Sequence, residues 1–87
     1  MKTAKQHKAD IDALTLALDA ADRERDESQR AFGNAQIGDS EFWKANDRML
    51  NAIAARIEAD HKLAKARASF AKYVQFLRAE QRFLLGE

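Results

Sequence analysis

Gly33-Asn34-Ala35-Gln36-Ile37-Gly38-Asp39 is the stretch that decides the fold, because it is the one break in a helix-favouring chain. It holds two of the three glycines, and the chain has no proline. On both sides Ala, Leu, Glu, Lys and Arg predominate, and these are strong helix formers. The sequence therefore predicts an all-α fold, an antiparallel two-helix hairpin of coiled-coil type. We expect a single domain over residues 1–87, with a helix over about 3–32, a turn over 33–39 and a longer helix over about 40–85.

The residues around the turn predict how the hairpin closes. Gly33 suits the position after a helix end, where the backbone is left-handed and glycine is favoured. Ile37 is expected to pack on Phe42 or Trp43. We expect Phe42 and Trp43 to close the core against Phe32 and Ile37. In the alternative, Trp43 is exposed and anchors a partner.

Apolar residues recur at three- and four-residue intervals in both arms, which is typical of a helix-packing seam. In the first arm the seam is predicted at Ala4, Ile11, Leu14, Leu18, Ala21 and Phe32, and the pattern weakens where Arg25 and Ser28 occupy seam positions. In the second arm it is predicted at Trp43, Leu50, Ile53, Ile57, Ala64 and Ala71, with a second stripe at Leu63, Phe70, Val74, Leu77 and Leu84.

The two arms differ in length, and this difference predicts an interface. At 1.5 Å per residue the first helix is roughly 44 Å long and the second roughly 69 Å. Folding at the turn places residue i of the first arm opposite about residue 72 − i, so the first arm ends near residue 70. The apolar residues beyond that point are Phe70, Tyr73, Val74, Phe76, Leu77, Phe83, Leu84 and Leu85. Because such a strip is large for a monomer, we expect these residues to form a partner interface, and the chain to be a homo-oligomer. In the alternative, the second helix kinks near Ser69 and folds residues near 70–85 back.

Basic residues gather at the end of the hairpin away from the turn. They are Lys2, Lys5, Lys8, Lys62, Lys65, Arg67 and Lys72. A solvated end is the favoured interpretation. The alternative is a nucleic-acid contact through Lys2, Lys5, Lys8, Lys62 and Lys65, although the net charge of only +1 gives no overall attraction to polyanions.

The sequence offers little chemistry for catalysis or cofactor binding. The hairpin register brings His7 and His61 within about a turn of each other, which we interpret as an interfacial or surface pair rather than a zinc site. No metal, nucleophile or phosphate-binding motif surrounds the titratable residues, and there is no cysteine. We therefore expect no enzymatic activity, no metal and no cofactor.

These observations favour a small protein–protein interaction module that acts as an inhibitor, regulator or adaptor. No targeting segment or membrane span is apparent, so a cytoplasmic protein with no membrane contact is expected. The bacterial or phage origin that we expect rests on the frequency of small alanine-rich hairpins among inhibitors from these sources.

In length and topology the chain resembles type III secretion needle subunits, their small hairpin chaperones and the Trp-x-Gly hairpin secretion substrates. Trp43 is followed by Lys44 and Ala45 rather than by x-Gly, and the proline of the needle turn is absent. The resemblance implies a third function, a secretion-system or phage structural subunit or chaperone, and assigns no family.

Overall fold

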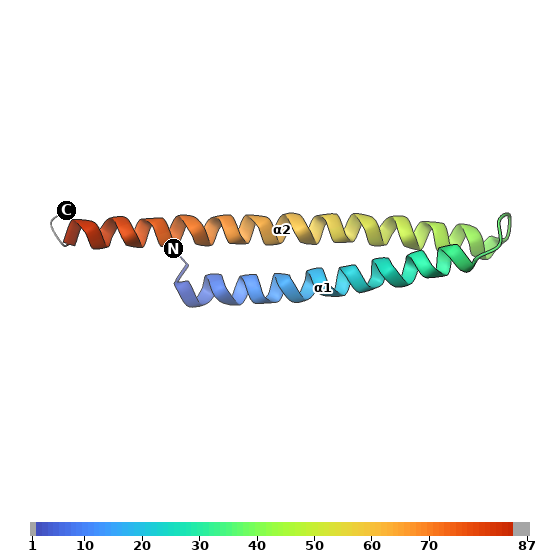
Figure 1. Ribbon diagram of the computed structural model, residues 1–87, viewed down its shortest axis with the longest axis horizontal. Helices are drawn as coiled ribbons and strands as arrows, with labels where there is room; N and C mark the ends of the chain where they lie inside the picture. Colours follow the sequence, from blue (N-terminus) through green and yellow to red (C-terminus); the bar gives the residue numbers. More distant parts are fainter. Residues whose placement is uncertain (1, 85–87) are drawn as a thin grey trace.

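The chain forms two helices that lie antiparallel against each other (Figure 1). The structure is a computed structural model that describes residues 2–84, with side chains for residues 2–81. Helix α1 spans Ala4–Asn34 and helix α2 spans Ser40–Leu84. The result is a rod with extents of 71 × 17 × 16 Å. The predicted all-α helical hairpin is confirmed. No stretch of helix between residues 2 and 84 has both the length and the apolar character needed to cross a bilayer.

The start of α1 is fixed by a capping box that the sequence analysis missed. The Thr3 hydroxyl accepts a hydrogen bond from the Gln6 N–H at 3.2 Å, and the Gln6 side chain accepts one from the Thr3 N–H at 2.8 Å. This arrangement satisfies N–H groups that the first helical turn leaves without a partner. It fixes where α1 begins and therefore how far α2 runs beyond it.

The turn uses Gly38, and the prediction for Gly33 is wrong. Gly33 lies inside α1, which ends at Asn34, and the capping residue Ala35 has an extended backbone (φ −79°, ψ 143°). Gly38 instead has a φ of 89°, in the left-handed region that favours glycine. Ile37 does not pack on the helix after the turn, because it is 89% exposed. The chain closes through Phe32 and Phe42, whose ring centroids lie 5.1 Å apart.

The face of α1 that meets α2 repeats every seven residues over the whole helix. Its buried or half-buried positions are His7, Ile11, Leu14, Leu18, Ala21, Arg25, Ser28 and Phe32. The prediction was right from Ile11 to Ala21 and at Phe32, but Ala4 is exposed. The seam also continues through Arg25 and Ser28, and Ser28 is fully buried.

The first predicted stripe of α2 is wrong by one residue at most of its positions, a rotation of about 100°, although Ile53 is half-buried. The second predicted stripe is right at Leu63 and Phe70, which lie in the seam. The buried or half-buried seam consists of Ala45, Met49, Ala52, Arg56, Ala59, Leu63, Ala66, Phe70 and Tyr73. Trp43, Leu50 and Ile57, which the prediction placed in the core, are 59%, 54% and 51% exposed. Alanine at alternate seam positions from Ala45 to Ala66 lets the helix axes approach closely, which larger side chains would prevent.

The register between the helices also differs from the prediction at the open end, where the N-terminus of α1 lies. His7 packs on Phe70 and Tyr73, with ring centroids 5.6 and 5.0 Å away, whereas the predicted register placed it opposite residue 65. The helices are thus shifted by more than a turn there. As a result α1 covers α2 as far as Tyr73, and the part of α2 that extends beyond it is shorter than predicted.

Candidate interaction surfaces

The segment of α2 beyond α1, which we call the overhang, runs from Val74 to Leu84 (Figure 1). In it Phe76 and Leu77 are 45% and 42% exposed, and Val74 is half-buried. The side chains of Phe83 and Leu84, and all of Leu85, lie outside the described residues. The overhang therefore retains exposed apolar side chains of the predicted strip.

Two members of the predicted strip do have an intrachain partner. Phe70 and Tyr73 are half-buried and contact His7, which is only 6% exposed. The prediction that Phe70 and Tyr73 have no intrachain partner is wrong, because the predicted register ended the first helix too early along α2. His7, Tyr73 and Phe76 line an open hollow at the root of the overhang, together with Lys2, Ser69 and Lys72.

The predicted pairing of the two histidines is not observed. His7 is buried against Phe70 and Tyr73, whereas His61 is exposed on α2. Among the described residues, no three His, Cys, Asp or Glu side chains come together as a metal ion would need.

Basic residues at the open end are spread over both helices, and some are paired. Lys2 contacts Asp10 at 2.7 Å and Lys62 contacts Glu58 at 3.1 Å. Lys2, Lys62 and Lys65 line one hollow together with Asp10, and Lys72 lines the hollow beside His7. Lys5, Lys8 and Arg67 are exposed. The contact patch predicted from sequence is thus interrupted by carboxylates.

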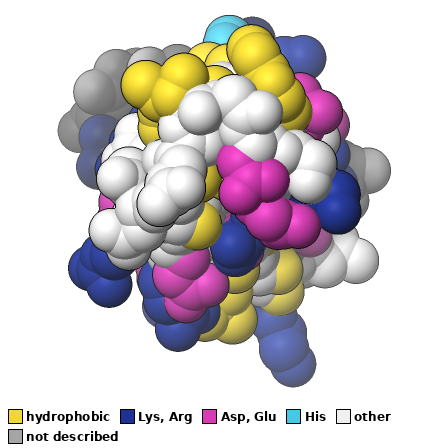
Figure 2. Space-filling model, turned by 90° about the vertical axis from the view of Figure 1, so that its right-hand side faces the viewer, with side chains coloured by type: hydrophobic (Ala, Val, Ile, Leu, Met, Phe, Trp, Pro, Cys, Tyr) yellow, Lys and Arg dark blue, Asp and Glu magenta, His cyan; other side chains and the backbone are white. Residues whose placement is uncertain are grey.

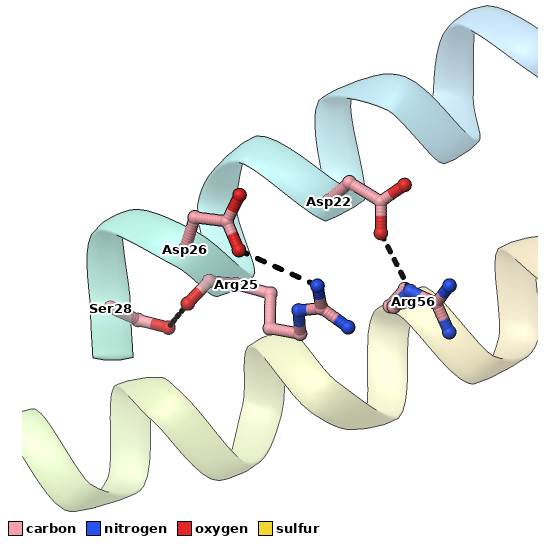
Figure 3. Close-up of polar contacts among 5 residues, drawn as sticks. All are labelled: Asp22, Arg25, Asp26, Ser28 and Arg56. Atoms are coloured by element: carbon pink, nitrogen blue, oxygen red, sulfur yellow. Dashed lines mark hydrogen bonds and ion pairs between the residues drawn. The ribbon is translucent and has the colours of Figure 1, made fainter. Parts of the chain in front are cut away.

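A polar layer crosses the middle of the seam (Figure 3). Arg56 of α2 donates a hydrogen bond to Asp22 of α1 at 2.6 Å, and Ser28 donates to the Arg25 carbonyl at 2.9 Å. The Nε atom of Arg25 is buried and makes no hydrogen bond within the described part of the chain, while its terminal nitrogen contacts Asp26 at 3.4 Å. The hydrogen bond and charge of Asp22 raise the pKa of Arg56.

Acidic residues of α1 between Asp22 and Glu27 contact arginines of α2, in addition to the contact of Asp26 with Arg25 on the same helix. Arg48 donates to both carboxylate oxygens of Glu24, at 2.7 and 3.1 Å, and lies 3.7 Å from Glu27. The hydrogen bond from Arg48 lowers the pKa of Glu24, and Glu24 in turn raises the pKa of Arg48. A bidentate contact fixes geometry as well as charge, so Glu24 and Arg48 mark one side of the seam.

Three large apolar residues form a stripe on the outer surface of α2. Trp43, Leu50 and Ile57 are seven residues apart and each is more than half exposed. The T-shaped contact between Trp43 and Phe42, with centroids 5.1 Å apart, links the stripe to the hairpin end. Viewed along the rod from the end with the turn, hydrophobic side chains reach the surface at the top and bottom (Figure 2). Because its apolar spacing resembles that of a core seam, this stripe was predicted as the core.

Comparison with protein-family models gave no match, and neither the search of curated proteins nor that of solved structures returned one.

Proposed function

We propose that this chain is a non-enzymatic protein–protein interaction module that self-associates through the overhang and acts by binding another protein. The observation that carries the proposal is the exposure of Phe76 and Leu77 on the part of α2 that has no helix opposite it. In an inhibitor, regulator or adaptor of this kind, binding alone changes the partner, because the bound hairpin occupies its surface.

The heptad positions of α2 support self-association. Phe70, Tyr73 and Leu77 follow one another at three- and four-residue intervals, so the seam that holds α1 continues into the overhang. The overhang is about 16 Å long. A second hairpin, placed end to end and antiparallel, would set its own overhang where α1 is missing. Burying a large apolar side chain completely stabilises a complex by roughly 1.5–3 kcal/mol, and these side chains are already half covered.

The two alternative functions have weaker support. A nucleic-acid contact would use basic side chains, of which Lys2 and Lys62 are already paired with carboxylates. A structural subunit would use the same overhang but form an open polymer instead of a closed dimer. Stoichiometry therefore separates the structural alternative from the proposed module.

Sedimentation velocity at micromolar concentration tests the proposal. We expect the wild-type chain to be a dimer or larger, and both Leu77→Asp and Phe76→Asp to be monomers, because an unpaired carboxylate is costly in an apolar interface. Leu16→Asp is the matched control, since Leu16 is 68% exposed on α1, away from the overhang. A monomeric wild-type chain, or a Leu77→Asp variant that associates as well as the control, would contradict the proposal.

A further inference from the structure

The face that carries Trp43, Leu50 and Ile57 has a second component on α1. Asp12, Asp19 and Asp26 are exposed and, like the apolar stripe, are seven residues apart. Each aspartate directly follows a seam residue of α1, and each member of the stripe directly follows a seam residue of α2. The two rows therefore have the same period and the same position relative to the seam.

These two rows flank the same side of the hairpin. Glu24 and Arg48 each directly precede a seam residue, and they meet across the seam. In an antiparallel helix pair, residues that precede the seam on both helices share one side. Those that follow it share the other side. The aspartates and the apolar stripe therefore border one face, which we call the Trp43 face.

The rows are also aligned along the rod. The ring contacts of Phe32 with Phe42 and of His7 with Phe70 show that these pairs lie at the same height along the rod axis. The heights of the residues between them follow from these two pairs. By interpolation Asp26 lies level with about Leu50, and Asp19 with about Ile57. Each of two successive heptads thus presents one large apolar side chain on α2 and one carboxylate on α1 at the same level.

More carboxylates border the stripe on α2 itself. Asp47 lies three residues before Leu50 and Asp60 three residues after Ile57, and both are exposed. Within the described residues no ion pair joins Asp12 or Asp19 to a basic side chain. Asp26 contacts Arg25 of its own helix at 3.4 Å, and the seam cation of α2, Arg56, is paired with Asp22. The Trp43 face is therefore apolar at its centre and acidic at its edges.

We infer that the Trp43 face binds an amphipathic helix of another protein that carries lysine or arginine beside its apolar stripe. Such a helix would place its apolar residues on Leu50 and Ile57, and its basic residues beside Asp19 and Asp26, in the manner of a helix docked on a helical hairpin. The charges give specificity, because the aspartates would repel the carboxylates of an acidic helix of the same shape.

The same charges argue against a second copy as the occupant. Self-pairing through a two-fold axis brings one patch onto itself. A pairing centred on Leu50 would set these acidic edges against each other, and one centred farther along α2 would bring Asp60 close to its own copy. The inference rests on the proposed function in taking the chain to bind another protein, but it uses residues remote from the overhang.

Trp43 provides the measurement, because it is the only tryptophan in the chain and lies on this face. The probe is a synthetic helical peptide of about three heptads, roughly 31 Å long, which covers the roughly 21 Å between Trp43 and Ile57. It carries leucine at two positions of each heptad and lysine beside them. The control peptide has glutamate in place of lysine. The host is the Leu77→Asp variant, so that self-association through the overhang does not interfere.

We expect the lysine peptide to shift the emission of Trp43 to shorter wavelength, and the glutamate peptide to leave it unchanged. The paired substitution Leu50→Asn with Ile57→Asn should raise the peptide dissociation constant at least about tenfold. Asp19→Asn with Asp26→Asn should weaken binding and reduce its dependence on salt. Phe76→Asn, which also removes an exposed large apolar side chain but from the overhang, should bind as the host does.

Three results would overturn the inference: no binding of the lysine peptide, equal binding of the glutamate peptide, or unaltered binding to the Leu50→Asn, Ile57→Asn variant. A fourth is loss of self-association when Leu50→Asn and Ile57→Asn are introduced into the wild-type chain, which would assign the face to a second copy. None of the peptide results depends on whether the overhang self-associates, so failure of either proposal is recognised separately.

Discussion

The imidazole of His7 and the ring of Tyr73 pack with centroids 5.0 Å apart, and this contact joins the first turns of α1 to the end of the covered part of α2. His7 also contacts Phe70 at 5.6 Å and is 6% exposed. It therefore fills a core position. This burial gives the histidine a structural role that its sequence neighbourhood did not indicate.

Replacing His7 with alanine should lower the free energy of unfolding by about 1–3 kcal/mol, because it removes the aromatic contacts and leaves a gap at the seam. His7→Phe should retain most of the stability. Urea unfolding followed by circular dichroism measures both changes. His61→Ala is the control, since His61 is exposed and its loss should matter by less than about 0.5 kcal/mol. Equal effects of the two alanine substitutions would contradict the core role of His7.

Arg25 should be a position where an apolar residue improves the fold. Its Nε atom is buried and has no hydrogen-bond partner among the residues that the structure describes, and such a group costs about 1–3 kcal/mol. We expect Arg25→Leu to raise the free energy of unfolding by about 1 kcal/mol, since leucine suits a seam position. Arg23→Leu, at an exposed site of the same helix, should change it little. A destabilised Arg25→Leu variant would show that the polar layer contributes more than its unpaired atom costs.

Glu24 should contribute a small pH-dependent stability. Its pKa is lowered from 4.5 in the folded chain by the hydrogen bond from Arg48. The ionised form is therefore favoured by folding, so the contribution is present above 4.5 and is lost as the pH falls through the lower folded pKa. Because both side chains are nearly half exposed, solvent screening keeps the effect small.

The loss of unfolding free energy between neutral pH and about pH 3 should accordingly be smaller in Glu24→Gln than in the wild type. Urea midpoints at the two pH values give the comparison. Glu58→Gln serves as control, because Glu58 pairs with Lys62 within α2 only and contributes nothing across the seam. Parallel losses in wild type and Glu24→Gln would show that the Arg48 contact does not form in solution.

The two internal glycines should respond oppositely to alanine. Gly33 is helical, and a Cβ added there meets nothing within 4 Å, so Gly33→Ala should raise the unfolding free energy by about 0.4–1 kcal/mol. Gly38 also has open space, but its φ of 89° strains any other residue. We expect Gly38→Ala to lower stability by about 1 kcal/mol. Thermal unfolding of both variants checks the pair, and stabilisation by both would place the turn elsewhere.

The fold could be predicted from the sequence because its determinants are local. Helix formers on either side of residues 33–39, and the absence of proline, are sufficient for two helices. The face of α2 could not be predicted in the same way. Trp43, Leu50 and Ile57 are more hydrophobic than Ala45, Ala52 and Ala59, and apolar periodicity alone selects the larger set. The smaller set packs against α1 because close approach of two helices requires small side chains.

The candidate surfaces were predicted in part. The excess length of α2 follows from the position of the turn, so the exposure of Phe76 and Leu77 could be predicted from the sequence. The contact of His7 with Phe70 could not be predicted, because shifting one helix along the other by a turn leaves the apolar pattern of a hairpin almost unchanged. The polar layer of Arg25, Ser28 and Arg56 shows a related difficulty. A buried serine satisfies its hydroxyl through its own helix, and no spacing rule indicates that bond.

The antiparallel register also determines the order in which contacts become accessible during folding. Glu24 and Arg48 are 24 residues apart in the chain, and Asp22 and Arg56 are 34 apart, so the loop that must close grows steadily with distance from the turn. Contacts near Phe32 and Phe42 close the shortest loop and form at the lowest entropic cost. The open end, with His7 between Phe70 and Tyr73, closes last and separates first. We therefore expect the two helices to separate locally at the open end while the region beside the turn remains paired.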